Sequence, residues 1–145
     1  MSVLNVAIAG FGTIGSGVAH VLAQHSEHPD AKIKLVGILE RDTQGQFVRS
    51  WFEKNPELFY DSLEKLLEDP KVDVIVETIG GSGFARELII NALQNGKHVI
   101  TANKDLIALH GAELIAVAQK NRRHLLFEAA VAGSIPVLRL LKDYL

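Results

Sequence analysis

Apolar residues along the chain follow two different spacings. Short runs rich in β-branched residues cover residues 3–9, 32–40, 72–78, 98–101 and 124–127, and the longer segments between them repeat apolar positions every three or four residues. The first spacing is typical of strands and the second of helices. Strands that alternate with helices form a parallel sheet with helices on both faces. The pattern therefore predicts an α/β fold, a doubly wound parallel sheet in a single domain.

Some of the expected helices have a clear apolar side. One begins at a glycine cluster, a second covers residues 84–94 and ends at Asn95-Gly96, and a third covers residues 104–119. An Asn-Gly pair suits the left-handed turn that closes a helix. The side chains expected to face the sheet are Ile14, Val18, Val21 and Leu22 in the first helix and Phe84, Leu88, Ala92 and Leu93 in the second.

Two helical signals between these segments are weaker. Residues 45–54 form a weak helical stretch, and Asp61 with Glu64 has the spacing of a capping box for a short helix. That helix is expected to stop at Asp69, because the residue before Pro70 disfavours helical backbone.

A glycine motif lies between the first strand and the first helix. It reads Gly10-Phe11-Gly12-Thr13-Ile14-Gly15, a G-x-G-x-x-G arrangement. In this context Gly10 permits a tight turn, Gly12 leaves room for phosphates, and Gly15 lets the helix pack closely on the strand. The free amides and positive dipole end of the helix N-terminus favour a bound anion. We therefore expect a Rossmann-type domain over residues 1–130 that binds the pyrophosphate of a nicotinamide dinucleotide.

The residues after the second strand bear on which dinucleotide binds. Glu40 could accept hydrogen bonds from the ribose hydroxyls of NAD. Arg41 could instead pair with the 2′-phosphate of NADP, since a guanidinium matches phosphate geometry. A solvated loop is the alternative for both. Glu40 therefore favours NAD and Arg41 favours NADP, and we expect NADP slightly more than NAD.

Further candidates follow the next two expected strands, at the edge where ligands of open parallel sheets gather. Small residues there let a cofactor approach the backbone, which suits the nicotinamide ribose. Asn103 could hold a ligand carbonyl or a ribose hydroxyl, or could cap the following helix. The residues expected at the cofactor are Thr78, Ile79 and Gly80 after one strand and Thr101, Asn103 and Lys104 after the next.

Lys104 is the strongest candidate for chemistry. Hydride transfer from a nicotinamide to a carbonyl group needs a positive charge or a proton donor near the developing alkoxide, and a lysine can serve as either. The alternative is a surface lysine at a helix start. A cation there opposes the helix dipole, so a bound anion nearby explains it better.

A third segment, residues 128–136, supplies oxygen atoms. Glu128 contributes a carboxylate, and the backbone carbonyls of Val131, Gly133 and Ile135 could turn inward together. An oxygen-only cage suits a hard cation. A tight turn whose carbonyls bind water is an equal alternative.

Four motifs carry a family resemblance. GFGTIGSGV, ETIGG, GKHVITANK and FEAAVAGSIP, in this order and at this spacing, resemble the N-terminal region of homoserine dehydrogenase. The resemblance implies an NAD(P)-dependent, reversible hydride transfer between L-aspartate 4-semialdehyde and L-homoserine, on the route to threonine, methionine and isoleucine. It also implies that Lys104 lies where cofactor and substrate meet, and that the cation is sodium.

The end of the chain bears on domain organisation. A last helix is expected from about Ile135, and it reaches residue 145 without a stop signal, which suggests a chain cut short. The resemblance implies that residues 131–145 begin the connection to an absent substrate-binding and dimerisation domain. On this interpretation the full-length protein is a homo-oligomer, and the fragment is inactive alone.

Composition narrows the other possibilities. Hydrophobic residues make up 48% of the chain, the formal net charge is -2, and cysteine is absent. These values allow one buried core, supply no basic face for nucleic acid, and exclude disulfides and thiolate metal sites. No apolar run approaches the ~20 residues that span a bilayer. We expect a cytoplasmic protein that binds a small molecule, and neither nucleic acid nor a membrane.

Two rival hypotheses share the glycine loop. A stand-alone dinucleotide-sensing module would explain the length of the chain, but not Lys104 or residues 128–136. A related reductase, such as an aspartate dehydrogenase or a dihydrodipicolinate reductase, lacks TANK followed by E-x-x-V-x-G-x-I-P.

Overall fold

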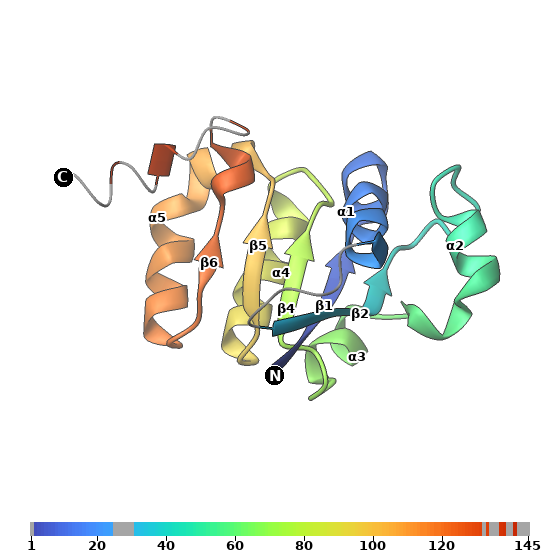
Figure 1. Cartoon of the computed structure of the whole chain (residues 1–145). Coiled ribbons are helices and arrows are strands. Elements are labelled where there is room, and N and C mark those ends of the chain that lie inside the picture. The colour runs from blue at the N-terminus through green and yellow to red at the C-terminus, as the bar shows by residue number, and fades with distance from the viewer. Residues whose placement is uncertain (1, 25–30, 132, 134–136, 139–140, 142–145) are drawn as a thin grey trace.

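The computed structural model describes residues 2–24, 31–131, 133, 137–138 and 141. Within these residues, strands and helices alternate along the chain (Figure 1). The strands are β1 (Ser2–Ala9), β2 (Ala31–Leu39), β3 (Phe59–Tyr60), β4 (Val74–Glu77), β5 (His98–Thr101) and β6 (Leu125–Leu126). The helices are α1 (Thr13–Gln24), α2 (Arg49–Lys54), α3 (Leu63–Glu68), α4 (Gly83–Gln94) and α5 (Lys104–Lys120), with 3-10 turns η1 (Pro56–Leu58) and η2 (Glu128–Ala130).

The strands form one parallel sheet in the order β3-β2-β1-β4-β5-β6. From β1 the chain builds outward through β2 and β3, and then returns to build the other half through β4, β5 and β6. The connections therefore diverge between β1 and β4, which leaves a crevice at the carboxyl ends of these strands. The expectation of a doubly wound, Rossmann-type α/β sheet is confirmed.

Helices cover both faces of the sheet because alternate strand residues point in opposite directions. Val6 and Ile8 of β1 pack in one cluster with residues of α1 and α2, whereas Ala7 and Ala9 pack in a second cluster with α3, α4 and α5. A strand covered on both sides must be apolar at nearly every position. In the described part of the chain no helix is long and apolar enough to span a membrane.

α1 packs on the core through Val18 and Leu22, as the sequence pattern predicted, but two other positions of the predicted stripe are exposed. Ile14 and Val21 are 56% and 57% exposed, whereas the smaller residues Gly15 and Ala19 are buried. A Cβ atom on Gly15 would lie 2.0 Å from the carbonyl oxygen of Gly10, so the helix sits too close to the loop for a branched side chain. The expectation for Ile14 and Val21 was wrong because close helix packing selects small residues at the contact.

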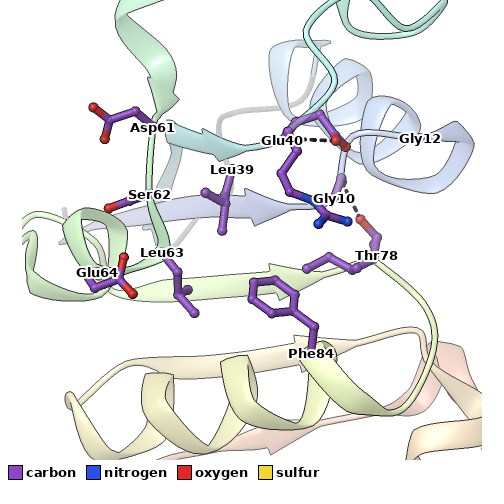
Figure 2. Close-up of a pocket in the computed structure, with 12 residues that line it drawn as sticks. Gly10, Gly12, Leu39, Glu40, Asp61, Ser62, Leu63, Glu64, Thr78 and Phe84 are labelled. Atoms are coloured by element: carbon purple, nitrogen blue, oxygen red, sulfur yellow. Dashed lines mark hydrogen bonds between the residues drawn. The ribbon is translucent and has the colours of Figure 1, made fainter.

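Phe84 also departs from its expected place, although Leu88, Ala92 and Leu93 of the same helix are buried as expected. Phe84 is 47% exposed and belongs to the first turn of α4, which follows the end of β4. The Phe84 side chain therefore lines the first cavity at the crevice and is not buried between the helix and the sheet (Figure 2).

The weaker helical signals were partly wrong at their boundaries. Of residues 45–54, only Arg49–Lys54 form a helix. Ser62, not Asp61, caps α3, since its Oγ accepts a hydrogen bond from the amide of Lys65 at 3.3 Å. Asp61 instead forms an ion pair with the Lys65 side chain at 2.5 Å, and this hydrogen bond lowers the pKa of the Asp61 carboxyl.

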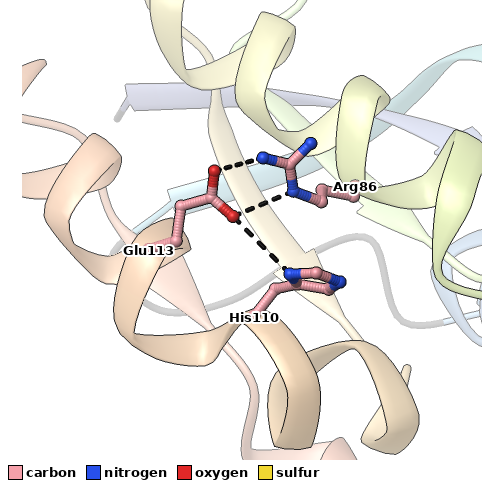
Figure 3. Close-up of polar contacts among 3 residues, drawn as sticks. All are labelled: Arg86, His110 and Glu113. Atoms are coloured by element: carbon pink, nitrogen blue, oxygen red, sulfur yellow. Dashed lines mark hydrogen bonds and ion pairs between the residues drawn. The ribbon is translucent and has the colours of Figure 1, made fainter.

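An ion-pair cluster joins the outer surfaces of α4 and α5 (Figure 3). The Arg86 guanidinium donates two hydrogen bonds to the Glu113 carboxylate, one of them from Nε at 2.8 Å, and Nδ1 of His110 lies 3.6 Å from the same carboxylate. The hydrogen bond from Arg86 lowers the pKa of Glu113. The cluster ties together the two helices that follow β4 and β5.

The close contact of α1 with the glycine loop predicts opposite effects for two equal substitutions. Gly15→Ala places a methyl group against backbone and should lower the free energy of unfolding by ~1–3 kcal/mol. Gly17→Ala adds the same group where no atom lies within 4 Å, and should raise it by ~0.5–1 kcal/mol. Urea unfolding followed by circular dichroism measures both, and equal changes would contradict the close contact.

Candidate functional site

Two adjacent cavities lie at the carboxyl ends of the central strands. The first, of about 490 Å³, lies between the glycine loop, the end of β2 and the start of α3. The second, of about 350 Å³, lies between the glycine loop, the loop after β4 and the start of α5. Thr78 and Ile79 line both cavities. The crevice therefore has two halves that meet where the connections of the sheet diverge.

The glycine loop is held against the end of β4. Gly10 has a φ of +92°, and a Cβ atom there would lie 2.7 Å from the carbonyl carbon of Thr78. The Thr78 hydroxyl donates a hydrogen bond to the Gly10 carbonyl at 2.7 Å (Figure 2). Gly12 has no atom within 4 Å of a Cβ position and lines the first cavity. The loop thus turns tightly at one glycine and leaves open space at the next.

The other motif residues divide between the core and the crevice. The Phe11 side chain is fully buried and packs edge-to-face against Trp51 and Phe59, with ring centroids 5.6 and 6.1 Å apart. Thr13 and Ile14 line the second cavity, which accounts for the exposure of Ile14. Phe11 therefore anchors the loop to α2 while its neighbours face the crevice.

Glu40 is bound to backbone amides of the site. Its Oε2 accepts a hydrogen bond from the Phe11 amide at 2.8 Å, and its Oε1 accepts from the amides of Arg41 and Asp42 at 2.7 and 3.1 Å. The carboxylate thereby links the end of β2 to the glycine loop. Figure 2 shows the Glu40 side chain beside Gly10. The Arg41 residue is exposed and lines the first cavity.

Three apolar residues that the sequence analysis did not assign to the site also line the first cavity. They are Leu39 at the end of β2, Leu63 at the start of α3 and Phe84 at the start of α4 (Figure 2). Such a surface suits a flat aromatic ring. In the sequence, each of these is an apolar residue next to the end of a strand or the start of a helix. Core residues occupy such positions as well, so the sequence alone does not distinguish the two cases.

The second cavity contains several of the expected residues. Thr78, Ile79, Gly80 and Lys104 line it, and Lys104 is an exposed residue at the first position of α5. Gly80 has a φ of +80°, a backbone conformation that favours glycine. The structure brings together the residues predicted after two different strands.

Of the two remaining predicted residues, Asn103 lines the second cavity and Thr101 is not part of its lining. Thr101 is fully buried, and its hydroxyl bonds to the carboxylate of Glu77. Asn103 lines the cavity and caps α5, since its Oδ1 accepts a hydrogen bond from the Leu106 amide at 3.1 Å. Asn103 therefore has the capping role that was one of its two alternatives in the sequence. Direct contacts of Thr101 and Asn103 with a cofactor stay a prediction.

The predicted cation ligands lie just beyond β6. Glu128 is exposed and begins η2, and its backbone carbonyl accepts a hydrogen bond from the amide of Val131 at 3.2 Å. Gly133 has a φ of +59°, and Ile135 lies outside the described residues. No three His, Cys, Asp or Glu side chains gather in the described part of the chain. Any cation at this segment would depend on backbone oxygens and one carboxylate, the donor type that hard cations take.

The sheet order, the glycine loop and the two-part crevice define a dinucleotide-binding domain of the Rossmann class. A family model described as "Homoserine dehydrogenase, NAD binding domain" matches residues 10–128. The chain therefore belongs to the NAD-binding domain family of homoserine dehydrogenases.

Individual relatives agree with this assignment. The chain is 35% identical to the homoserine dehydrogenase of Bacillus subtilis over 99% of its own length and 33% of the relative's. It is 38% identical to that of Corynebacterium glutamicum, over 94% of the chain and 31% of the relative. The chain thus spans about a third of the length of these curated relatives.

Solved structures show the same fold. The crystal structure of a homoserine dehydrogenase from Thiobacillus denitrificans superposes with a TM-score of 0.84 at 36% identity, covering 99% of this chain and 33% of that one. A hyperthermophilic archaeal homoserine dehydrogenase in complex with NADPH superposes with a TM-score of 0.76 at 27% identity, covering 96% of this chain and 48% of that one.

The open space at Gly12 predicts a loss of binding without a loss of stability. Gly12→Ala places a methyl group in the cavity where phosphates would approach, and should weaken NADPH binding by about tenfold or more. The free energy of unfolding should not fall, because the added Cβ meets no protein atom. Gly17→Ala is the matched control, and tight NADPH binding by Gly12→Ala would contradict the expected position of the phosphates.

Proposed function

We propose that this chain is the cofactor-binding part of an enzyme that transfers hydride reversibly between L-aspartate 4-semialdehyde and L-homoserine. The observation that carries the proposal is the two-part crevice, in which Lys104 shares a cavity with the loop after β4. Membership of the family and the NADPH in the archaeal relative support it.

In this proposal the two halves of the dinucleotide occupy the two cavities. The adenine ring packs among Leu39, Leu63 and Phe84, which form the apolar part of the first cavity. The pyrophosphate lies over Gly12, at the amino end of α1, where free amides and the helix dipole favour an anion. The nicotinamide half extends along Thr78 and Gly80 into the second cavity.

The bound nicotinamide supplies or accepts the hydride. Lys104 places its ammonium group beside the substrate oxygen, where a positive charge stabilises the alkoxide that develops as an aldehyde is reduced. Ile14 and Ile79 contribute apolar surface to the same cavity, which lowers the local dielectric constant and strengthens that interaction.

We further propose that residues 131–145 begin the connection to the substrate-binding and dimerisation part of a longer homo-oligomeric protein. The proposal is supported by the length of the relatives, of which this chain spans about a third. On this basis the chain binds the dinucleotide by itself but does not turn over substrate.

The first experiment is a titration with NADPH and, in parallel, NADH. Trp51 is the single tryptophan of the chain and packs against Phe11 of the glycine loop, so its fluorescence should report binding. Because three backbone amides already use most of the acceptor sites of the Glu40 carboxylate, Arg41 should dominate the choice, and NADPH should bind about tenfold tighter, or ~1.4 kcal/mol. Failure of both dinucleotides to saturate a folded sample would overturn the proposed function.

Arg41→Ala tests the preference directly. It should bring the affinity for NADPH down to that for NADH and leave the affinity for NADH unchanged. Arg49→Ala removes a charge of the same kind from α2, where Arg49 pairs with Glu53, and should alter neither affinity. A preference for NADPH that survives Arg41→Ala would show that another group reads the 2′-phosphate.

We also propose that Glu128, with the carbonyls of Val131, Gly133 and Ile135, binds sodium. Sodium chloride should then raise the thermal unfolding midpoint above that in choline chloride at equal ionic strength, because a ligand that binds only the folded state stabilises it. Glu128→Gln should abolish the difference, and Glu57→Gln, at another exposed carboxylate, should keep it. Equal midpoints of the unmodified chain in the two salts would reject the site.

A further inference from the structure

Buried polar side chains concentrate at one place in the described part of the chain. Of the four polar or charged residues that are buried in this part of the chain, three lie together; the four are Glu77, Lys97, Thr101 and Asn103. Lys97 donates a hydrogen bond to the Asp69 carbonyl at 2.6 Å, away from the crevice. The other three follow one another at the carboxyl ends of β4 and β5, where Glu77 and Thr101 are partners in register. A buried carboxylate is costly unless hydrogen bonds satisfy it, so its position calls for a physical reason.

Both oxygens of the Glu77 carboxylate accept hydrogen bonds. Oε1 accepts from the amides of Ile79 and Gly80 at 2.8 and 3.2 Å, and so fixes the loop that lines the second cavity. Oε2 accepts from the Thr101 hydroxyl at 2.5 Å. The hydroxyl oxygen of Thr101 in turn accepts a hydrogen bond from the backbone amide of Asn103 at 3.0 Å. One carboxylate therefore holds the ends of two neighbouring strands together.

Asn103 closes the network on the far side of the cavity. Its Nδ2 donates to the Gly81 carbonyl at 2.6 Å, and its Oδ1 accepts from the Leu106 amide in the first turn of α5. The loop after β4 and the start of α5 are thereby joined twice, through Glu77 and through Asn103. Lys104 is the residue directly after this junction.

We propose that Glu77 is a positioning residue for the nicotinamide half of the cofactor and for Lys104. It acts through Thr101 and Asn103, which set the start of α5 at a fixed distance from the loop at Ile79 and Gly80. The inference rests on the proposed function, in which the second cavity receives the nicotinamide. The donors and acceptors that link these segments all find their partners within the protein, so the network holds the cavity in shape before a ligand binds.

The position needs a carboxylate and not an amide. An ionised carboxyl group accepts hydrogen bonds on both oxygens, whereas glutamine presents a donor on one side. In Glu77→Gln the amide group would donate to the Thr101 hydroxyl, whose own proton would then lack the acceptor that it has now. An unsatisfied buried donor costs more than a missing bond at the surface.

A pair of ligands separates positioning from general stability. NADPH contains both nucleotides, and adenosine 2′,5′-bisphosphate contains only the adenosine half with its 2′-phosphate. Glu77→Gln and Thr101→Val should weaken NADPH binding by about tenfold, because the cavity would no longer be held in its binding shape before the ligand arrives. Both variants should bind adenosine 2′,5′-bisphosphate as the unmodified chain does. Thr101→Ser keeps the hydroxyl and should retain both affinities.

Titrations followed by Trp51 fluorescence or calorimetry, below the unfolding midpoint of each variant, measure these affinities. Equal weakening of the two ligands, or unchanged NADPH binding in Thr101→Val, would overturn the positioning role. If Glu77→Gln does not fold, the Thr101→Val and Thr101→Ser pair decides the question. Absence of NADPH binding by the unmodified chain contradicts the proposed function itself, and is thus distinguishable from failure of this inference.

Discussion

The contact between the glycine loop and the end of β4 is the constraint on which the site depends. Gly10 turns with a positive φ directly against Thr78, and Gly15 lets α1 approach the same turn. Any side chain at either position would push α1 and β4 apart. Because the two cavities share Thr78 and Ile79 as a wall, the separation of these elements sets the shape of the whole crevice.

Two carboxylates organise the loops around this contact in similar ways. Glu40 holds the glycine loop from the end of β2, and Glu77 holds the loop after β4 and reaches β5 through Thr101. Both carboxylates accept hydrogen bonds from backbone amides that would otherwise lack partners, because the hydrogen bonds between strands stop at the strand ends. A carboxylate at the end of a buried strand is a compact way to satisfy several amides and to fix loops without adding residues.

The helices α4 and α5 are joined twice, once at the protein surface and once through the buried network. Arg86 and Glu113 join α4 to α5 at the protein surface (Figure 3). Asn103 joins the loop before α4 to the start of α5. The surface ion pair contributes little to stability by itself, since both groups remain hydrated. The buried network contributes more to geometry, because solvent does not compete for its hydrogen bonds.

The sequence by itself determined the fold class, the place of the glycine loop and the family. These follow from local patterns: β-branched runs, the glycine spacing, and motifs such as GKHVITANK, which were sufficient to predict the parallel sheet and the crevice at its carboxyl edge. The tertiary structure alone decided that Phe84 faces the crevice, that Ile14 turns from the sheet, and that Glu77 connects two loops. A local pattern of apolar residues predicts whether a segment is a helix or a strand. It does not predict which strands become neighbours or which side chains of a helix lie beyond the sheet. Those depend on contacts between residues far apart in the chain, and so they become visible only when the strands are in register.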